Sequence, residues 1–390
     1  VMQSRFLAEK LITTWGYRED RAKVVALGYR DDPVQGDVVD SDPAKQSANY
    51  FVGRTRSLGV VYHVLDWFSL LGNRSSSVGI PSFNRTIFPA GQLAPATEGL
   101  GSDYGVAFDL LGGRLNAKFV RFTSDESFSV GAIAAQGTFT NRNLRVMEAF
   151  AGALVGAGRP FSQSQWDALY KLYTPAVSGS LSDFQSSGYE ARVTANLTPR
   201  WRLVANYSYT DSGRTNLFSD SIPWYGVKPA AGGLLAQGVS QNAAGQFVID
   251  PSAYEANGAV AKWIELGRAS PAANPATLTT SANVTIAQEL FNLVDEMNQS
   301  KLEQEKRWGL RAHKVSLFTA YDFKEGFLRN VSLGGGWRWQ SANIIGSDAN
   351  RREITGGALA SADLMVRYAH KFRGLPGRVT FQINVNNVLD

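Results

Sequence analysis

The chain has 390 residues, of which 44% are hydrophobic and 19% charged, and it contains no cysteine. The lack of cysteine excludes disulfides, thiolate zinc sites and cysteine nucleophiles. The longest nearly uninterrupted apolar run, residues 149–158, is about half as long as a membrane-spanning helix, which excludes a helical membrane protein. The net charge of +5 comes without a Lys/Arg-rich block, which argues against nucleic-acid binding.

Segments in which apolar and polar residues alternate follow one another in pairs along the chain. The clearest pair is 188–197 and 201–211, where odd positions are mostly apolar, even positions are mostly polar, and Pro199 lies in the turn between them. Two successive segments of about ten residues, each alternating apolar and polar residues with a period of two, predict a β-hairpin. Similar pairs are 6–17 with 21–30, 54–65 with 68–74, 103–111 with 114–122, 314–323 with 330–340, and 358–370 with 378–388. The sequence therefore predicts about twelve strands, with the first hairpin turning at 18–20.

The connections alternate in length. Links within the hairpins have from two to about seven residues, whereas those between hairpins have from about 17 to about 100. The long ones are 31–53, 75–102, 123–187, 212–313 and 341–357, and two of them carry helical patterns at 164–173 and 285–306. In an up-and-down sheet this alternation puts every short turn at one end. Compact soluble domains rarely have several connections this long, whereas outer-membrane barrels have this asymmetry.

Alternation alone also fits a soluble β-sandwich or propeller, but three features favour a membrane. The strands approach the ten residues that cross hydrocarbon at a tilt, the polar positions carry charged and amide side chains in mid-strand, and aromatic residues gather near strand ends. A sheet can span lipid only when all its backbone groups are paired, which requires a closed barrel. We therefore predict an all-β fold that forms part of an antiparallel transmembrane β-barrel.

The parity of each strand assigns its side chains to one of two faces. The residues predicted to face a watery lumen are Glu190, Arg192, Asn196, Arg202, Asn206, Arg338, Gln340, Asp363, Arg367, Gln382, Asn384 and Asn386. The residues predicted to face lipid are Tyr189, Val193, Leu197, Trp201, Leu203, Tyr207, Val315, Leu317, Tyr321, Leu333, Trp337, Leu364, Val366, Tyr368, Phe381, Ile383 and Val385. Most of the first set is expected to hydrate the inner wall rather than to contact a solute.

Several segments, taken in order, resemble the C-terminal part of the barrel of a TonB-dependent outer-membrane receptor. They are 66–78, 98–119, 188–211, 307–323, 332–340 and the closing NVNNVLD, which is similar to the family's Asn-Leu-Phe-Asp signature with Val388 and Leu389 in place of Leu-Phe. The resemblance implies a barrel of about 22 strands with a plugged lumen. Residues 1–390 would be a partial barrel domain, because neither a signal peptide, a plug, a TonB-contacting segment nor the closing strand is recognised.

The resemblance also implies a function, namely active transport of a scarce solute such as a ferric siderophore, cobalamin or a glycan. The implied partners are the bilayer of a Gram-negative outer membrane, the TonB complex and the protein's own plug. Two alternatives stay open, a passive porin-like channel and a surface-exposed adhesion or binding barrel.

Residues for catalysis or metal binding are not found in the sequence. The three histidines, His63, His313 and His370, have no metal-ligand spacing to one another or to a carboxylate cluster. The glycine run 334–336 lies within a predicted strand and lacks the Lys-Ser/Thr pair of a phosphate loop. We therefore expect no enzyme activity and no cofactor, and we interpret Asp295 and Glu296 as part of a solvated helix face.

Overall fold

The computed structural model describes residues 1–26, 29–32, 36–39, 42, 47–80, 86–87, 92–131, 135–158, 161–173, 180–268, 271–306, 308–348, 350–371 and 377–389. One antiparallel sheet of twelve strands dominates the molecule, and its strands follow one another in chain order. They are β1 (Met2–Phe6), β2 (Leu11–Ala26), β5 (Ser47–Leu65), β6 (Phe68–Gly79), β9 (Thr97–Leu110), β10 (Leu115–Gly131), β11 (Ser180–Thr198), β12 (Trp201–Thr215), β15 (His313–Asp322), β16 (Val331–Gln340), β19 (Leu359–His370) and β20 (Val379–Val385). The predicted antiparallel all-β fold is confirmed.

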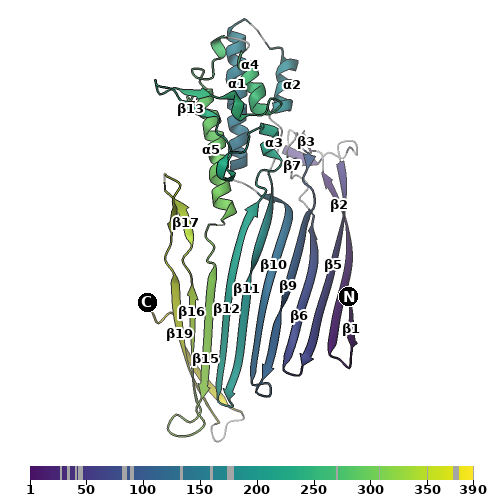
Figure 1. Ribbon diagram of the computed structural model, residues 1–390, viewed down its shortest axis with the longest axis vertical. Helices are drawn as coiled ribbons and strands as arrows, with labels where there is room; N and C mark the ends of the chain where they lie inside the picture. The colour runs from purple at the N-terminus through teal and green to yellow at the C-terminus, as the bar shows by residue number, and fades with distance from the viewer. Residues whose placement is uncertain are drawn as a thin grey trace.

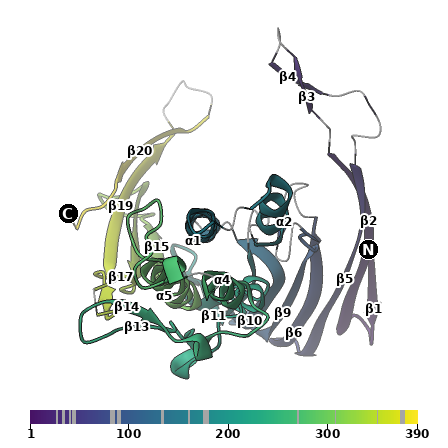
Figure 2. The same ribbon diagram turned by 90° about the horizontal axis from the view of Figure 1, so that it is seen from above.

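The sheet curves into an arc rather than a closed ring (Figure 2). β1 and β20 are its two edges. Short turns join the strands at one end, and the long connections lie at the other (Figure 1). The predicted one-sided arrangement of the connections is therefore present.

The first hairpin differs from the prediction. Its turn lies at residues 7–10 and not at 18–20, so β2 runs without interruption through the charged segment. Leu7, Ala8 and Glu9 all have positive φ, between 53° and 69°, which makes the turn there. The carboxylate of Glu19 accepts a hydrogen bond from Arg54 of β5 at 3.2 Å, so this charged segment pairs across the sheet instead of turning.

Five helices lie in the part of the chain that the structure describes, all at the end with the long connections (Figure 1). α2 (Gln163–Tyr173) and α5 (Ile286–Glu305) were predicted; α1 (Ala135–Gly156), α3 (Ser221–Tyr225) and α4 (Ala259–Arg268) were not. We call these helices and the turns between them the helical cap. α5 begins with a local signal, since Thr285 Oγ1 accepts a hydrogen bond from the backbone N–H of Gln288 at 3.1 Å.

Short elements complete the fold. They are the strand pairs β3 (Tyr29–Asp32) with β4 (Gly36–Val39), β7 (Thr86–Ile87) with β8 (Gln92–Leu93), β13 (Val239–Gln241) with β14 (Phe247–Ile249) and β17 (Ile344–Ser347) with β18 (Glu353–Thr355), and the 3-10 turns at 231–233, 251–253 and 271–273.

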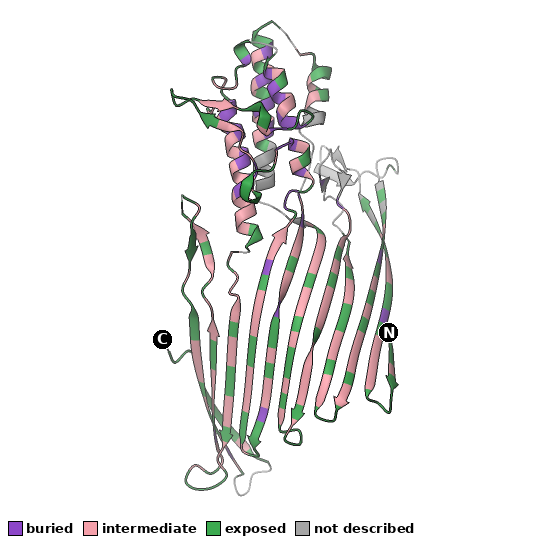
Figure 3. Cartoon of the chain, viewed as in Figure 1, coloured by how far each residue is buried: buried purple, intermediate pink, exposed green. Residues whose placement is uncertain are grey.

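The principal hydrophobic core lies in the cap and not on the sheet (Figure 3). Phe150 of α1, Tyr225 of α3, Trp263 of α4 and Leu290 of α5 are each at most 1% exposed. The strands instead carry stripes of half-buried and exposed residues. Among the described residues, no helix has the length and apolar character needed to cross a bilayer.

Candidate functional site

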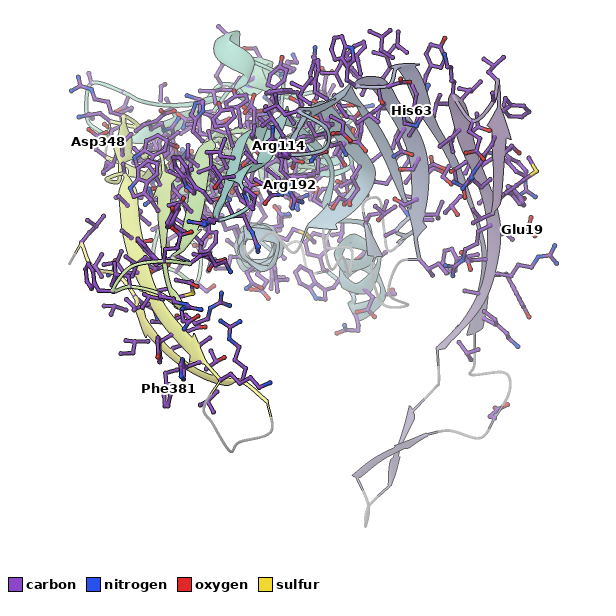
Figure 4. The ribbon with its side chains drawn as sticks, turned by 90° about the horizontal axis from the view of Figure 1, so that it is seen from below. Glu19, His63, Arg114, Arg192, Asp348 and Phe381 are labelled. Carbon is purple, nitrogen blue, oxygen red and sulfur yellow. The ribbon has the colours of Figure 1, made fainter. Side chains whose placement is uncertain are left out.

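The strand register places the two predicted sets of side chains on opposite faces of the sheet. Residues paired across an antiparallel ladder share a face. One such row contains Lys118, Arg192, Asn206, Ser316 and Arg338, from β10 to β16. In Figure 4, Arg192 lies on the concave side of the arc and Phe381 on the convex side. The polar residues predicted for the lumen share the face of Arg192 wherever this register pairs them, and the apolar ones share the face of Phe381. Leu197 and Asn386 lie at positions that these ladders do not pair.

On the concave face, part of the polar set surrounds one hollow of about 520 Å³. Glu190, Arg192, Asn206, Arg338 and Gln340 line it, together with Lys118 and Lys314. Arg338 pairs with Asp363 of β19 at 2.7 Å, and the amide of Asn206 donates a hydrogen bond to the Ser316 hydroxyl at 3.2 Å.

The charge in this hollow is predominantly positive. Lys118 stands directly opposite Arg192 in the ladder, and like charges in that position repel. The charged side chains that line the hollow are the cations Lys118, Arg192, Lys314 and Arg338 and a single carboxylate, Glu190. An anionic group bound in the hollow would relieve this repulsion.

A second group of the polar set lies nearer the short turns. Asn196 pairs with Arg202 across β11 and β12, and both line a smaller hollow of about 220 Å³ with Arg367. Arg367 donates a hydrogen bond to the Ser332 hydroxyl at 3.1 Å. The remaining residues, Gln382, Asn384 and Asn386, lie on or just beyond the edge strand β20 and line neither hollow.

The convex face presents a band of exposed apolar side chains. From β12 to β20, the exposed apolar side chains on this face are Trp201, Tyr207, Leu317, Tyr321, Leu333, Trp337, Leu364, Val366, Phe381, Ile383 and Val385. A soluble protein would cover such a face, so the band requires an apolar partner.

Aromatic residues border this band in two belts. The upper belt is a register row of Tyr104, Tyr189, Tyr209 and His313, with Arg121 between the first two, and the rings of Tyr209 and His313 are 4.8 Å apart. The lower belt contains Trp201 opposite Tyr321, and Trp67 stacked on Phe108 with 6.3 Å between ring centroids. Trp201 and Tyr209 are eight residues apart on β12, which is about 27 Å along a strand and about 20 Å of height at a tilt near 40°.

Sequence reasoning missed an ionic cluster that joins α1 to α5 in the cap. Arg142 donates hydrogen bonds to Glu289 at 2.8 Å and to Glu296, and Arg145 donates to Glu289 at 2.7 Å. Glu289 is 1% exposed. Burial lowers the pKa of Arg142, but the carboxylates of Glu296 and Glu289 outweigh it and hold that pKa above its ordinary value. Arg142 and Arg145 are spaced to share one face of α1, and Glu289 and Glu296 are spaced to share one face of α5. Only the fold brings these two faces together.

Asp295 and Glu296 are partly exposed, as expected of a solvated helix face, but both also form ion pairs. Glu296 pairs with Arg142, and Asp295 accepts hydrogen bonds from Arg351 and, at 3.0 Å, from Gln237. The two carboxylates tie α5 to α1 and to the segment after β17.

The histidines lie apart from one another and from acidic clusters. The His63 ring is 2.8 Å from the Ser69 hydroxyl, His313 is 3.0 Å from the Tyr207 hydroxyl, and His370 stacks on Tyr368. Over the described ranges of the chain, no group of three or more His, Asp or Glu side chains is placed to hold a metal ion.

No protein-family model and no curated protein matches the chain. Solved structures similar to it include the alcaligin outer-membrane receptor FauA from Bordetella pertussis (13% identity, TM-score 0.46), the ferric-catecholate import receptor Fiu from E. coli K12 (13%, 0.48) and the siderophore receptor PiuA from Acinetobacter baumannii (14%, 0.47). The matches cover 99%, 98% and 98% of this chain, but only 41%, 38% and 37% of those proteins. The chain thus spans about two fifths of their length.

Proposed function

We propose that this chain forms part of the barrel wall of a TonB-dependent receptor in the outer membrane of a Gram-negative bacterium. The observation that carries the proposal is the pair of opposite faces on one sheet. The convex face holds an apolar band between two aromatic belts, and the concave face holds charged and amide side chains. Lipid outside and water inside is the environment that makes both faces stable.

The transported solute would pass along the concave face. Of the cations in its hollow of about 520 Å³, Lys118 and Arg192 are direct neighbours in the ladder. This charge favours a solute with acidic groups within the expected class of ferric siderophores, cobalamin and glycans. The wall would bind and orient the solute, while the energy for uptake comes through the TonB complex and the protein's own plug. No chemical conversion of the solute is proposed.

The test is uptake of labelled candidate solutes by cells that carry the complete protein. Uptake that stops when a protonophore removes the proton-motive force, or when TonB is deleted, supports the proposal. Uptake that continues under both conditions indicates a passive channel. Surface binding without uptake of any candidate indicates an adhesion or binding barrel.

A variant pair tests the role of the hollow. Lys118→Gln with Arg192→Gln is expected to weaken binding of an acidic solute by about tenfold or more, because each lost charged hydrogen bond is worth about 1.5–3 kcal/mol. Arg74→Gln, on the convex face, should leave solute binding unchanged. Equal effects of the two variants on solute binding would remove the hollow from the solute path.

A further inference from the structure

The convex face carries a compact group of arginines above the upper aromatic belt. Arg54 and Arg56 are two residues apart on β5, which puts them about 7 Å from each other. Arg74 of β6 is paired with Leu58, so it is the diagonal neighbour of Arg56, again at about 7–8 Å. All three side chains are exposed. We call these three residues the outer arginine cluster.

Further cations extend this cluster along β2. Lys23 lies 5.7 Å from the centre of the Tyr50 ring. Arg21 donates a hydrogen bond to Glu19 at 2.9 Å, and Arg54 donates to the other oxygen of the same carboxylate at 3.2 Å. Glu19 lies on the convex side of β2 (Figure 4). One carboxylate is thus shared by two arginines, and the surface keeps a positive excess.

A hollow of about 800 Å³ opens beside the cluster. Arg54 and Arg56 line one side of it, and the aliphatic side chains of Val52, Val78 and Leu100 also line it. Glu98 and Asp125 stand at its far side, on β9 and β10, and their charge would keep an anion on the arginine side. The hollow therefore combines cationic groups with apolar surface, as an amphiphilic ligand requires.

The height of the cluster identifies the kind of ligand. Tyr104 of the upper belt pairs with Gly72 of β6, so Arg74 lies two residues further toward the long connections. Arg56 lies two residues beyond Leu58, the partner of Arg74, in the same direction. The cluster thus lies just above the upper belt. Aromatic belts mark the boundary between acyl chains and headgroups, so the cluster lies at headgroup height.

We propose that the outer arginine cluster binds the phosphate of an anionic lipid headgroup, with Val52, Val78 and Leu100 against the lipid's apolar part. Guanidinium forks bind phosphate oxygens in a bidentate manner, and basic pockets on membrane proteins recognise such headgroups. A lipid, and not free phosphate, is the ligand because apolar side chains line the hollow. This inference rests on the proposed membrane location of the convex face.

The test uses the complete protein in phosphatidylcholine nanodiscs that contain a minor fraction of phosphatidylglycerol. Native mass spectrometry then counts the phosphatidylglycerol retained after partial delipidation. The triple variant Arg54→Gln, Arg56→Gln and Arg74→Gln is expected to retain it about tenfold more weakly or worse. A control variant on the concave face, Lys118→Gln with Arg192→Gln and Arg338→Gln, removes the same charge and should retain as much as the unchanged protein.

Two further measurements keep the outcome decisive if the triple variant folds poorly. The single variant Arg56→Gln should show a smaller loss in the same direction, and inorganic phosphate at millimolar concentration should not displace the lipid. Equal retention by all proteins, or displacement by inorganic phosphate, would overturn the inference. Failure of the proposed membrane location is seen separately, because brominated acyl chains would then not quench the fluorescence of Trp201 and Trp337.

Discussion

The substitution Leu317→Arg tests the assignment of the convex face most directly. Leu317 lies on β15, paired with Ala205 and Trp337, and its side chain is 38% exposed. It is four residues from Tyr321 in the lower belt and four from His313 in the upper belt. Four residues are about 13 Å of strand, so the side chain lies near the middle of the apolar band. An arginine at the midplane of a barrel's lipid face costs about 2–4 kcal/mol.

Two substitutions on the same strand serve as controls. Tyr321→Arg, at the lower belt, is expected to cost at most about 1 kcal/mol because the charge reaches the headgroups. Phe318→Arg places the same charge one residue away on the concave face, where Phe318 pairs with Val204 and Gly336, and should also cost far less than Leu317→Arg. Urea titration of the complete protein in lipid vesicles, followed by tryptophan fluorescence, gives each free energy of unfolding. Equal costs for Leu317→Arg and Phe318→Arg would refute the assignment.

Three further predictions concern the cap and its contact with the sheet. Glu289→Gln should destabilise the cap by about 3 kcal/mol because it breaks a buried ion cluster, whereas Glu296→Gln, at a more exposed site, should cost at most about 1 kcal/mol; hydrogen exchange of α1 and α5 measures both. Burial raises the pKa of the Tyr254 phenol above its ordinary value of 10.0, so the unfolded chain releases this proton first. The cap should therefore lose stability as pH rises above about 10, and less so in Tyr254→Phe, by near-ultraviolet circular dichroism. Gly213→Val should displace the end of α5 and raise its protease sensitivity, because a Cβ there would lie 2.0 Å from the Glu305 carbonyl oxygen; Gly72→Val, with no atom within 4 Å of its Cβ, should be tolerated.

Much of the sheet could be predicted because its information is local. A strand alternates its side chains with a period of two, so parity alone separates Arg192 from Val193 whatever the rest of the chain does. The alternation of short and long links between strands likewise predicted that all short turns lie at one end of the sheet. Turn positions were less certain where charges interrupt the alternation, which is why the first hairpin was placed about ten residues too late.

The cap could not be predicted as a unit. Only α5 has a strong local pattern, with Thr285 as its N-cap. The apolar face of α1 becomes a core only when α5, 130 residues later, packs against it, and Glu289 is buried only because Arg142 and Arg145 arrive from another connection.

Alternation along the chain determined by itself that this protein forms long antiparallel strands with one apolar and one polar face, since that property depends on each residue's immediate neighbours. Only the tertiary structure decided which side chains meet across strands. The opposition of Lys118 and Arg192, the grouping of Arg54 and Arg56 with Arg74, and the joining of two distant connections into one cap all depend on register and packing between segments far apart in sequence. No local pattern specifies those distances.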